Sequence, residues 1–198
     1  MTYSDFNLDT VMKSFNLTIT RIALFDKVRP MSISPWLKES LDKGLQLVLL
    51  SEKARSELIV VPILLASREL THNAFSIYSG HRLDIEPEKS LLGECDFILT
   101  RTQPLPMIQS PIVTLVEAKK NDIESGLGQC AAQMLGARIF NQREGCDITT
   151  IYGCVTTGEV WQFLKLSDNT IYIDSGRYYI DNIEKILGVL QVIVESYT

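Results

Sequence analysis

The part of the chain before residue 71 carries apolar residues at helical intervals. Two helices are expected there, at residues 34–50, which open with a Ser-Pro pair, and at residues 51–70. Ser51 can cap the second helix, and Pro62 should bend it because proline cannot donate a backbone hydrogen bond. One buried stripe is expected on this second helix, formed by Ala54, Leu58, Val61 and Leu65.

Further along, the pattern changes to short runs rich in β-branched and aromatic residues, which are typical of strands. Three such runs follow one another before a helix with one broad apolar face, expected at residues 122–144. Three more strands and an apolar closing helix at residues 182–197 complete the chain. The predicted strands lie within residues 75–85, 94–101, 111–120, 147–158, 159–166 and 169–175.

This order of elements predicts an α/β fold with a mixed central sheet. An all-parallel sheet needs a helix after every strand, and three consecutive strands are incompatible with it. The length of 198 residues fits a single domain, 1–198. Residues 1–33 give weak mixed signals and are interpreted as an N-terminal extension. Residues 34–155 form the expected core, and residues 156–198 supply C-terminal strands and a helix that pack on it.

The closing helix is apolar on more than one side. Val189 and Ile193 are apolar although they lie outside its main stripe. A helix that is apolar on most sides must be covered on most sides. We therefore expect this helix to lie between the sheet and a second subunit, and we predict a homodimer. The main stripe consists of Ile183, Ile186, Leu187, Leu190 and Val194.

Composition and charge narrow the class of protein. Hydrophobic residues make up 45% and charged residues 22%, as in ordinary globular proteins. The net charge of −5 argues against a protein whose whole surface binds nucleic acid, but it allows a local basic groove. No apolar run is long enough to span a membrane, and the N-terminus lacks the pattern of a signal peptide, so we expect a cytoplasmic protein.

Cysteine and histidine give no recognisable metal or redox motif. His72 and His81 are isolated, which disfavours a zinc site or histidine-based catalysis. No two cysteines have the two-residue spacing of a zinc or redox motif, so we interpret them as free thiols of a reducing compartment. The cysteines are Cys95, Cys130, Cys146 and Cys154.

Charged side chains gather where the third predicted strand ends, in the sequence TLVEAKK. Side chains alternate along a strand, so Glu117 and Lys119 point the same way. If the preceding strand pairs with this one, Asp96 converges on the same edge of the sheet. Two carboxylates suit Mg²⁺, which prefers oxygen ligands and is often held by one or two carboxylates together with substrate phosphate. Such an ion would polarise a phosphodiester and activate water, and Mn²⁺ could substitute for it.

The next helix adds polar side chains to this region. Gln129 and Gln133 are four residues apart and therefore lie on one side of the helix. Amides there could bind phosphate or base edges, and Lys120 is a further candidate for substrate binding. The alternative remains that the glutamines form the polar face of an amphipathic helix and that Lys120 is a solvated partner for an acid.

An acid on one strand, Glu-x-Lys on the next and Gln-xxx-Gln on the following helix resemble the PD-(D/E)XK nuclease superfamily, which has the restriction-endonuclease-like fold. The resemblance covers residues 50–155 and implies a core of helix, three strands, helix and strand. It implies that Asp96 and Glu117 ligate Mg²⁺, that Ala118 lends its backbone carbonyl, and that Lys119 assists the attacking water.

Two positions are less well fixed by this resemblance. The first core helix of that fold often carries a glutamate near the site, for which Glu57 is the first choice and Glu52 the second. Cys95 stands where other members have a proline before the first acid, a position that varies in the family.

Three functions follow as hypotheses. The first is a metal-dependent nuclease acting on nucleic acid, with DNA as the expected substrate. The second is a module of the same fold that binds nucleic acid or a protein without cutting. The third is an unrelated α/β protein in which Glu117 and Lys119 form a surface ion pair. A nuclease should carry a basic rim around its acids, and the expected members of that rim are Arg55, Arg101, Lys120 and Arg138.

Overall fold

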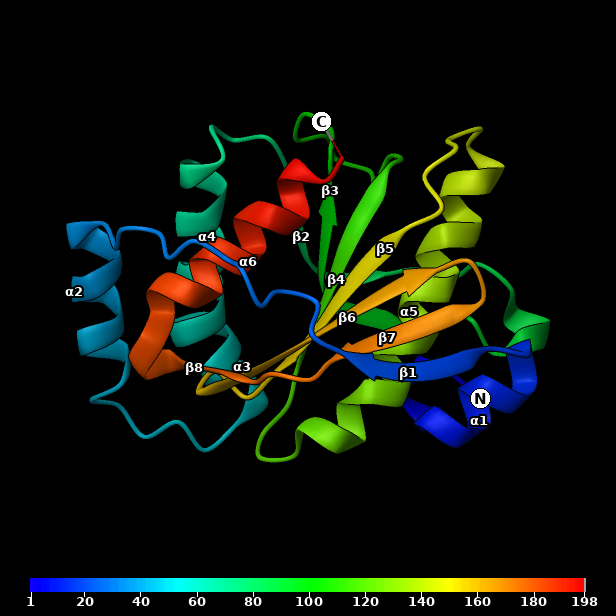
Figure 1. The fold of residues 1–198 in the computed structure, drawn as a ribbon, viewed down its shortest axis with the longest axis horizontal. Helices are drawn as coiled ribbons and strands as arrows, with labels where there is room; N and C mark the ends of the chain where they lie inside the picture. The colour runs from blue at the N-terminus through cyan, green and yellow to red at the C-terminus, as the bar shows by residue number, and fades with distance from the viewer. Residues whose placement is uncertain (198) are drawn as a thin grey trace.

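One mixed sheet separates two layers of helices in the computed structural model, which describes residues 1–197 (Figure 1). The strands are β1 (Thr18–Ile22), β2 (Ser76–Arg82), β3 (Glu94–Thr100), β4 (Ile112–Ala118), β5 (Ile151–Thr156), β6 (Val160–Ser167), β7 (Thr170–Asp174) and β8 (Tyr178–Tyr179). The helices are α1 (Leu8–Phe15), α2 (Pro35–Gly44), α3 (Glu52–Arg55), α4 (Val61–Leu70), α5 (Ile123–Arg143) and α6 (Ile183–Glu195). A short 3₁₀ turn, η1 (Tyr3–Asp5), precedes α1, and a π-helical turn, η2 (Ser56–Val60), joins α3 to α4.

The sheet has eight strands in the order β1-β7-β6-β5-β4-β3-β2, with β8 beside β6. The pairs β4/β5 and β1/β7 are parallel, and the other neighbours are antiparallel. The predicted mixed central sheet is therefore confirmed. All seven residues of β4 are buried, because helices cover both faces of the sheet at this central position.

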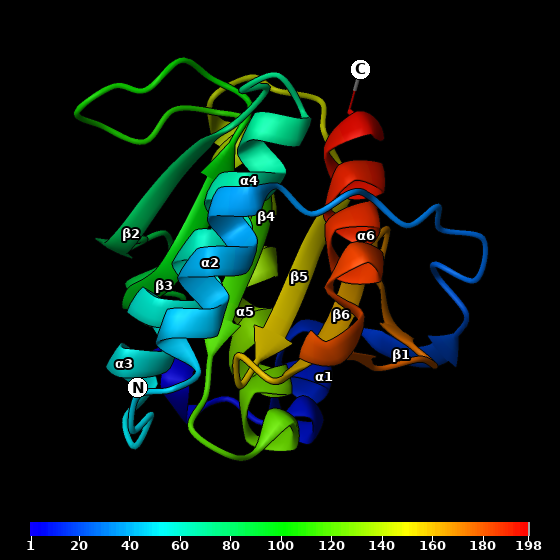
Figure 2. The ribbon, with the colours of Figure 1, turned by 90° about the vertical axis from the view of Figure 1, so that its left-hand side faces the viewer.

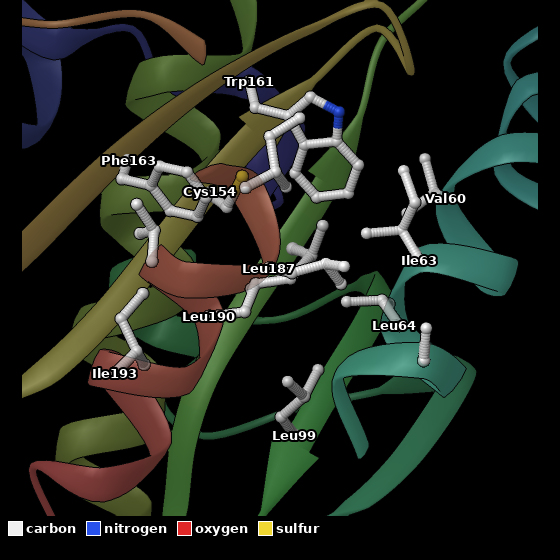
Figure 3. Close-up of a cluster of buried hydrophobic side chains, with 14 of the residues drawn as sticks. Val60, Ile63, Leu64, Leu99, Cys154, Trp161, Phe163, Leu187, Leu190 and Ile193 are labelled. Atoms are coloured by element: carbon white, nitrogen blue, oxygen red, sulfur yellow. The ribbon is translucent and has the colours of Figure 1, made fainter. Parts of the chain in front are cut away.

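Helices α2, α4 and α6 lie on one face of the sheet, and α5 lies on the other with α1 (Figure 2). On the first face, Trp161 and Phe163 of β6 meet the apolar sides of α4 and α6 (Figure 3). On the second face, α5 is buried on most sides, because the sheet covers one side of it and the N-terminal segment covers another.

The helices before the sheet depart from the prediction at two points. The first helix ends at Gly44, and residues 45–50 form a loop with exposed apolar side chains. The predicted stripe on the second helix is wrong, since Leu65 is 45% exposed and the buried face is instead that of Ile59 and Ile63. Pro62 lacks the N–H that would bond to the carbonyl four residues earlier, and the π-helical turn just before it rotates the following residues.

The N-terminal segment is part of the fold rather than an appendage to it. Strand β1 extends the sheet by pairing with β7, more than 150 residues away in sequence. The segment also packs tightly on α5: a side chain at Gly128 would lie 2.3 Å from the backbone of Asn7, and one at Gly136 would lie 2.3 Å from the hydroxyl of Tyr3. These glycines allow the two segments to approach closely.

Helix α6 is covered within the chain. Val189 and Ile193, which suggested a second subunit, are 0% and 1% exposed. The segment before α2 covers the outer side of α6, where a side chain at Gly188 would lie 2.3 Å from the carbonyl oxygen of Arg29. The homodimer stays a prediction, but the apolar character of α6 no longer argues for it. Within residues 1–197, no helix is long and apolar enough to cross a membrane.

Candidate active site

Asp96 and Glu117 lie on neighbouring antiparallel strands, at the end of their ladder. The last backbone pair between β3 and β4 at this end is Phe97 with Val116. Beyond it, Oδ2 of Asp96 accepts a hydrogen bond from the backbone N–H of Ala118 at 2.7 Å. This side-chain hydrogen bond takes the place of a backbone hydrogen bond between the two strands. Oδ1 of Asp96 has no hydrogen-bond partner among residues 1–197, and this leaves one carboxylate oxygen available for a ligand.

Glu117 and Lys119 form a buried ion pair. Nζ of Lys119 lies 2.9 Å from Oε1 of Glu117, and the predicted common orientation of the two side chains is confirmed. Glu117 is only 3% exposed, and the side chain of Lys119 is 17% exposed. The surface location that the third hypothesis gave to this pair is therefore wrong, because both charges are largely removed from solvent.

The two glutamines of α5 hold this ion pair from one side. Oε1 of Gln129 accepts a hydrogen bond from Nζ of Lys119 at 2.9 Å. Nε2 of Gln133 donates to Oε2 of Glu117 at 2.9 Å, and Gln133 is fully buried. Gln133 thus orients the carboxylate from behind, which differs from its predicted contact with substrate. Gln129 is also buried, so its first role is to orient Lys119.

Two features that the sequence analysis missed fix Lys119 in place. The backbone N–H of Lys119 donates to the carbonyl of Thr156 on β5 at 2.7 Å, which holds the residue to the sheet just after β4 ends. A side chain at Gly126 would lie 3.1 Å from Cγ of Lys119 and 2.6 Å from Cγ1 of Val155. The glycine therefore leaves room for the lysine stem between helix and sheet. Its signal in the sequence is a glycine inside a long helical pattern, which usually has a packing or functional reason.

Burial shifts the acid–base properties of these groups. Burial and the nearby Asp96 carboxylate raise the pKa of Glu117 to about 7, although Lys119 and Gln133 favour its ionised form. Burial also raises the pKa of Asp96, against the hydrogen bond from Ala118. Burial alone would lower the pKa of Lys119, but the ion pair with Glu117 and the charges of Glu52 and Asp96 together outweigh burial, so the pKa is raised. The protonation of each carboxyl group therefore depends on the charge of the other and on the Lys119 ammonium.

The donor atoms at this site fit a hard divalent cation. Asp96 and Glu117 offer carboxylate oxygens, and the backbone carbonyl of Ala118, the residue after Glu117, is the expected third oxygen. In the part of the chain that the structure describes, no three His, Cys, Asp or Glu side chains are grouped so that they could hold a metal by themselves. A bound Mg²⁺ would accordingly take its remaining ligands from water and substrate phosphate, as Mg²⁺ commonly does.

Helix α3, at the position of the first core helix, brings Glu52 rather than Glu57 to the site. Oε1 of Glu52 accepts a hydrogen bond from the backbone N–H of Lys120 at 3.2 Å, and its charge acts on Asp96 and Lys119. Glu57 instead pairs with Lys53 at 3.8 Å with a 60% exposed side chain, so the first choice from the sequence is replaced by the second. The ammonium of Lys120 has no partner within residues 1–197.

The expected basic rim is dispersed. Arg101 donates to the carbonyl of Tyr197, and Arg138 donates to the carbonyl of Asp168. Arg55 is near the site but donates to the carbonyl of Thr157 and to Glu159. Of the four predicted cations, only Lys120 is adjacent to the acids and has a side chain without a partner among the described residues.

Comparison with models of known protein families and with curated proteins finds no match to this chain.

Proposed function

We propose that this chain is a metal-dependent nuclease that hydrolyses phosphodiester bonds of nucleic acid, with DNA as its substrate. The proposal includes a restriction-endonuclease-like core of the PD-(D/E)XK superfamily, formed by α3 to α4, β2 to β4, α5 and β5. The observation that carries it is the buried Glu117–Lys119 ion pair beside Asp96, at the point where β3 and β4 part. Glu117 is buried, and Asp96 and Lys119 are partly buried beside it. Removing these charges from solvent costs stability, so a purely structural role accounts poorly for them.

In this proposal Asp96, Glu117 and the carbonyl of Ala118 would hold Mg²⁺, or Mn²⁺ in its place. The bound ion supplies Lewis acidity toward the phosphodiester and lowers the pKa of a water molecule. Lys119 is held by Gln129 and Glu117, and its ammonium orients the water and offsets charge that develops on the phosphoryl oxygens. Gln133 keeps the carboxylate of Glu117 in its orientation. Lys120 and Gln129 remain candidates for contact with the substrate backbone.

The first test removes a metal ligand and the catalytic lysine separately. Titration calorimetry with Mn²⁺ and Mg²⁺ should show binding to the wild type that is lost in Asp96→Ala, and the wild type should nick plasmid DNA. Lys119→Ala should lower cleavage by about two or more orders of magnitude while metal binding persists, because it removes an electrostatic group and not a ligand. The matched control is Lys53→Ala, which removes an 83% exposed lysine of α3 and should change neither property.

The outcomes separate the hypotheses. Retained cleavage in Lys119→Ala would contradict the mechanism. Absence of metal binding in the wild type, with DNA present, would contradict the function itself.

A second candidate is a module that binds nucleic acid or a protein without cleaving it. The dispersed rim favours this candidate, since Arg55, Arg101 and Arg138 are bonded to carbonyl groups elsewhere in the chain. Metal binding without nicking of any tested DNA, in a wild type that still binds DNA, would support it over the nuclease.

A further inference from the structure

Arg177 is held by a buried glutamine of the sheet. Nε of Arg177 donates to Oε1 of Gln162 at 3.3 Å, and Gln162 is 1% exposed. Nε2 of Gln162 donates to the carbonyl of Asp174 at 2.9 Å and to that of Gly176 at 3.1 Å, so its amide orientation is fixed. Because two carbonyl groups hold the amide nitrogen of Gln162, its amide oxygen holds Arg177 in one orientation. The guanidinium of Arg177 is therefore preoriented.

This guanidinium lies on the same face of the sheet as the proposed catalytic site. Glu117 pairs with Val155 across β4 and β5, and Val155 pairs with Gln162 across β5 and β6. The three side chains form a row on the face that α5 covers. Two strand spacings place the backbone of Gln162 about 10 Å from that of Glu117. Arg177 continues the row at its end.

The outer side of the guanidinium is bonded to a carboxylate that is easily exchanged. Nη2 of Arg177 donates to Oε1 of Glu124 in the first turn of α5. The side chain of Glu124 is 63% exposed and that of Arg177 is 34% exposed. Ion pairs with this exposure contribute little to stability. Nη1 of Arg177 has no partner in residues 1–197, which leaves donors for a bidentate acceptor.

We infer that Arg177 binds a non-bridging phosphate of the substrate backbone, one or two nucleotides from the bond that is cut, and that Glu124 occupies the guanidinium when no substrate is bound. A phosphate offers the same pair of oxygens as a carboxylate with more charge, so it can displace Glu124. The inference rests on the proposed function and assigns a position to one part of its substrate. It also gives the acidic site a second fixed cation besides Lys119.

The test compares variants that have opposite expected effects. Binding of a short fluorescein-labelled DNA is measured by anisotropy in Lys119→Ala protein with Mg²⁺, so that the probe stays intact. Arg177→Gln should weaken binding about tenfold. It should also make the negative slope of log affinity against log salt concentration shallower by about one. Glu124→Gln leaves Arg177 in place and removes its competitor, so it should tighten binding severalfold. Circular dichroism establishes that each variant is folded.

Arg143→Gln is the control, because it removes one equal charge at the other end of α5. Arg143 pairs with Glu86 there, and its place in the last turn is about 28 Å from Glu124 along the helix. A loss of affinity in Arg143→Gln equal to that in Arg177→Gln would overturn the inference, since net charge alone would explain both. Binding unchanged by Arg177→Gln or weakened by Glu124→Gln would also overturn it, and the proposed function would stand. A parent protein that binds neither metal nor DNA would remove the proposed function and the inference together.

Discussion

At the scale of single residues, the site holds charged groups whose ionised forms are disfavoured by burial. Glu117 has its two oxygens bonded to Lys119 and Gln133, yet its pKa still rises to about 7. Burial and the neighbouring Asp96 therefore outweigh the favourable partners. A divalent cation between the carboxylates would reverse this balance by favouring both ionised forms, and the same atoms would then stabilise the fold.

The raised pKa of Glu117 predicts how stability depends on pH in the presence of EDTA. Its pKa is 4.5 in the unfolded chain and about 7 in the folded protein, so the folded state binds the extra proton between these values. Stability should fall as pH rises through this window, by about 3 kcal/mol in total. Urea unfolding of the wild type and Glu117→Gln at about pH 5 and about pH 8 measures it. The wild type should lose more stability than the variant, and equal losses in both would contradict a raised pKa of Glu117.

At the scale of elements, strands and long helices were predictable because their own residues carry the signal. Strands β3 and β4 are apolar runs and α5 is a long helix, so the sequence predicted correctly that Asp96 lies on one strand and Glu117 on the next. The N-terminal segment was missed because β1 is only five residues long and its partner β7 is remote in sequence. The choice between Glu52 and Glu57 failed because η2 breaks the helical periodicity between the two. The hydrogen bonds that hold Arg177 could not be predicted from the sequence, because Gln162 and its partners become neighbours only in the folded sheet.

The contact between η1 and α5 predicts a coupling between Tyr3 and Gly136. The hydroxyl of Tyr3 is buried without a partner in residues 1–197, so Tyr3→Phe should be neutral or stabilise by about 1 kcal/mol. Gly136→Ala should destabilise the wild type by roughly 1–3 kcal/mol, because the new methyl group meets that hydroxyl. In the Tyr3→Phe background this cost should fall by at least about 1 kcal/mol, as measured by a double-mutant cycle of urea unfolding.

Gly128→Ala is the control for this cycle. Its methyl group would meet the backbone of Asn7, which Tyr3→Phe does not change, so its cost should be the same in both backgrounds. Additive effects of Tyr3→Phe and Gly136→Ala would contradict the predicted contact.

At the scale of the whole molecule, charge is arranged against simple electrostatic capture of DNA. The net charge is −5, and the charges of Glu52 and Glu94 act on Asp96. Arg101 and Arg138, which were expected beside the acids, are bonded to carbonyl groups elsewhere. If the proposed function holds, the divalent cation must bridge protein and phosphate, because few side chains are available to do so directly.

This arrangement predicts DNA binding that depends strongly on divalent metal and weakly on monovalent salt. Lys119, Lys120 and Arg177 are the cations expected to contact phosphate, and three contacts give a slope of about −3 for log affinity against log salt concentration. Without Mg²⁺ the acids repel the backbone, so EDTA should weaken binding by about tenfold or more. Anisotropy of labelled DNA with Lys119→Gln protein, which keeps two of the three cations, should give a slope of about −2 with Mg²⁺. A steep slope of about −6 that persists in EDTA would mean that an unassigned basic surface binds DNA, and the acids of β3 and β4 would then have no part in holding it.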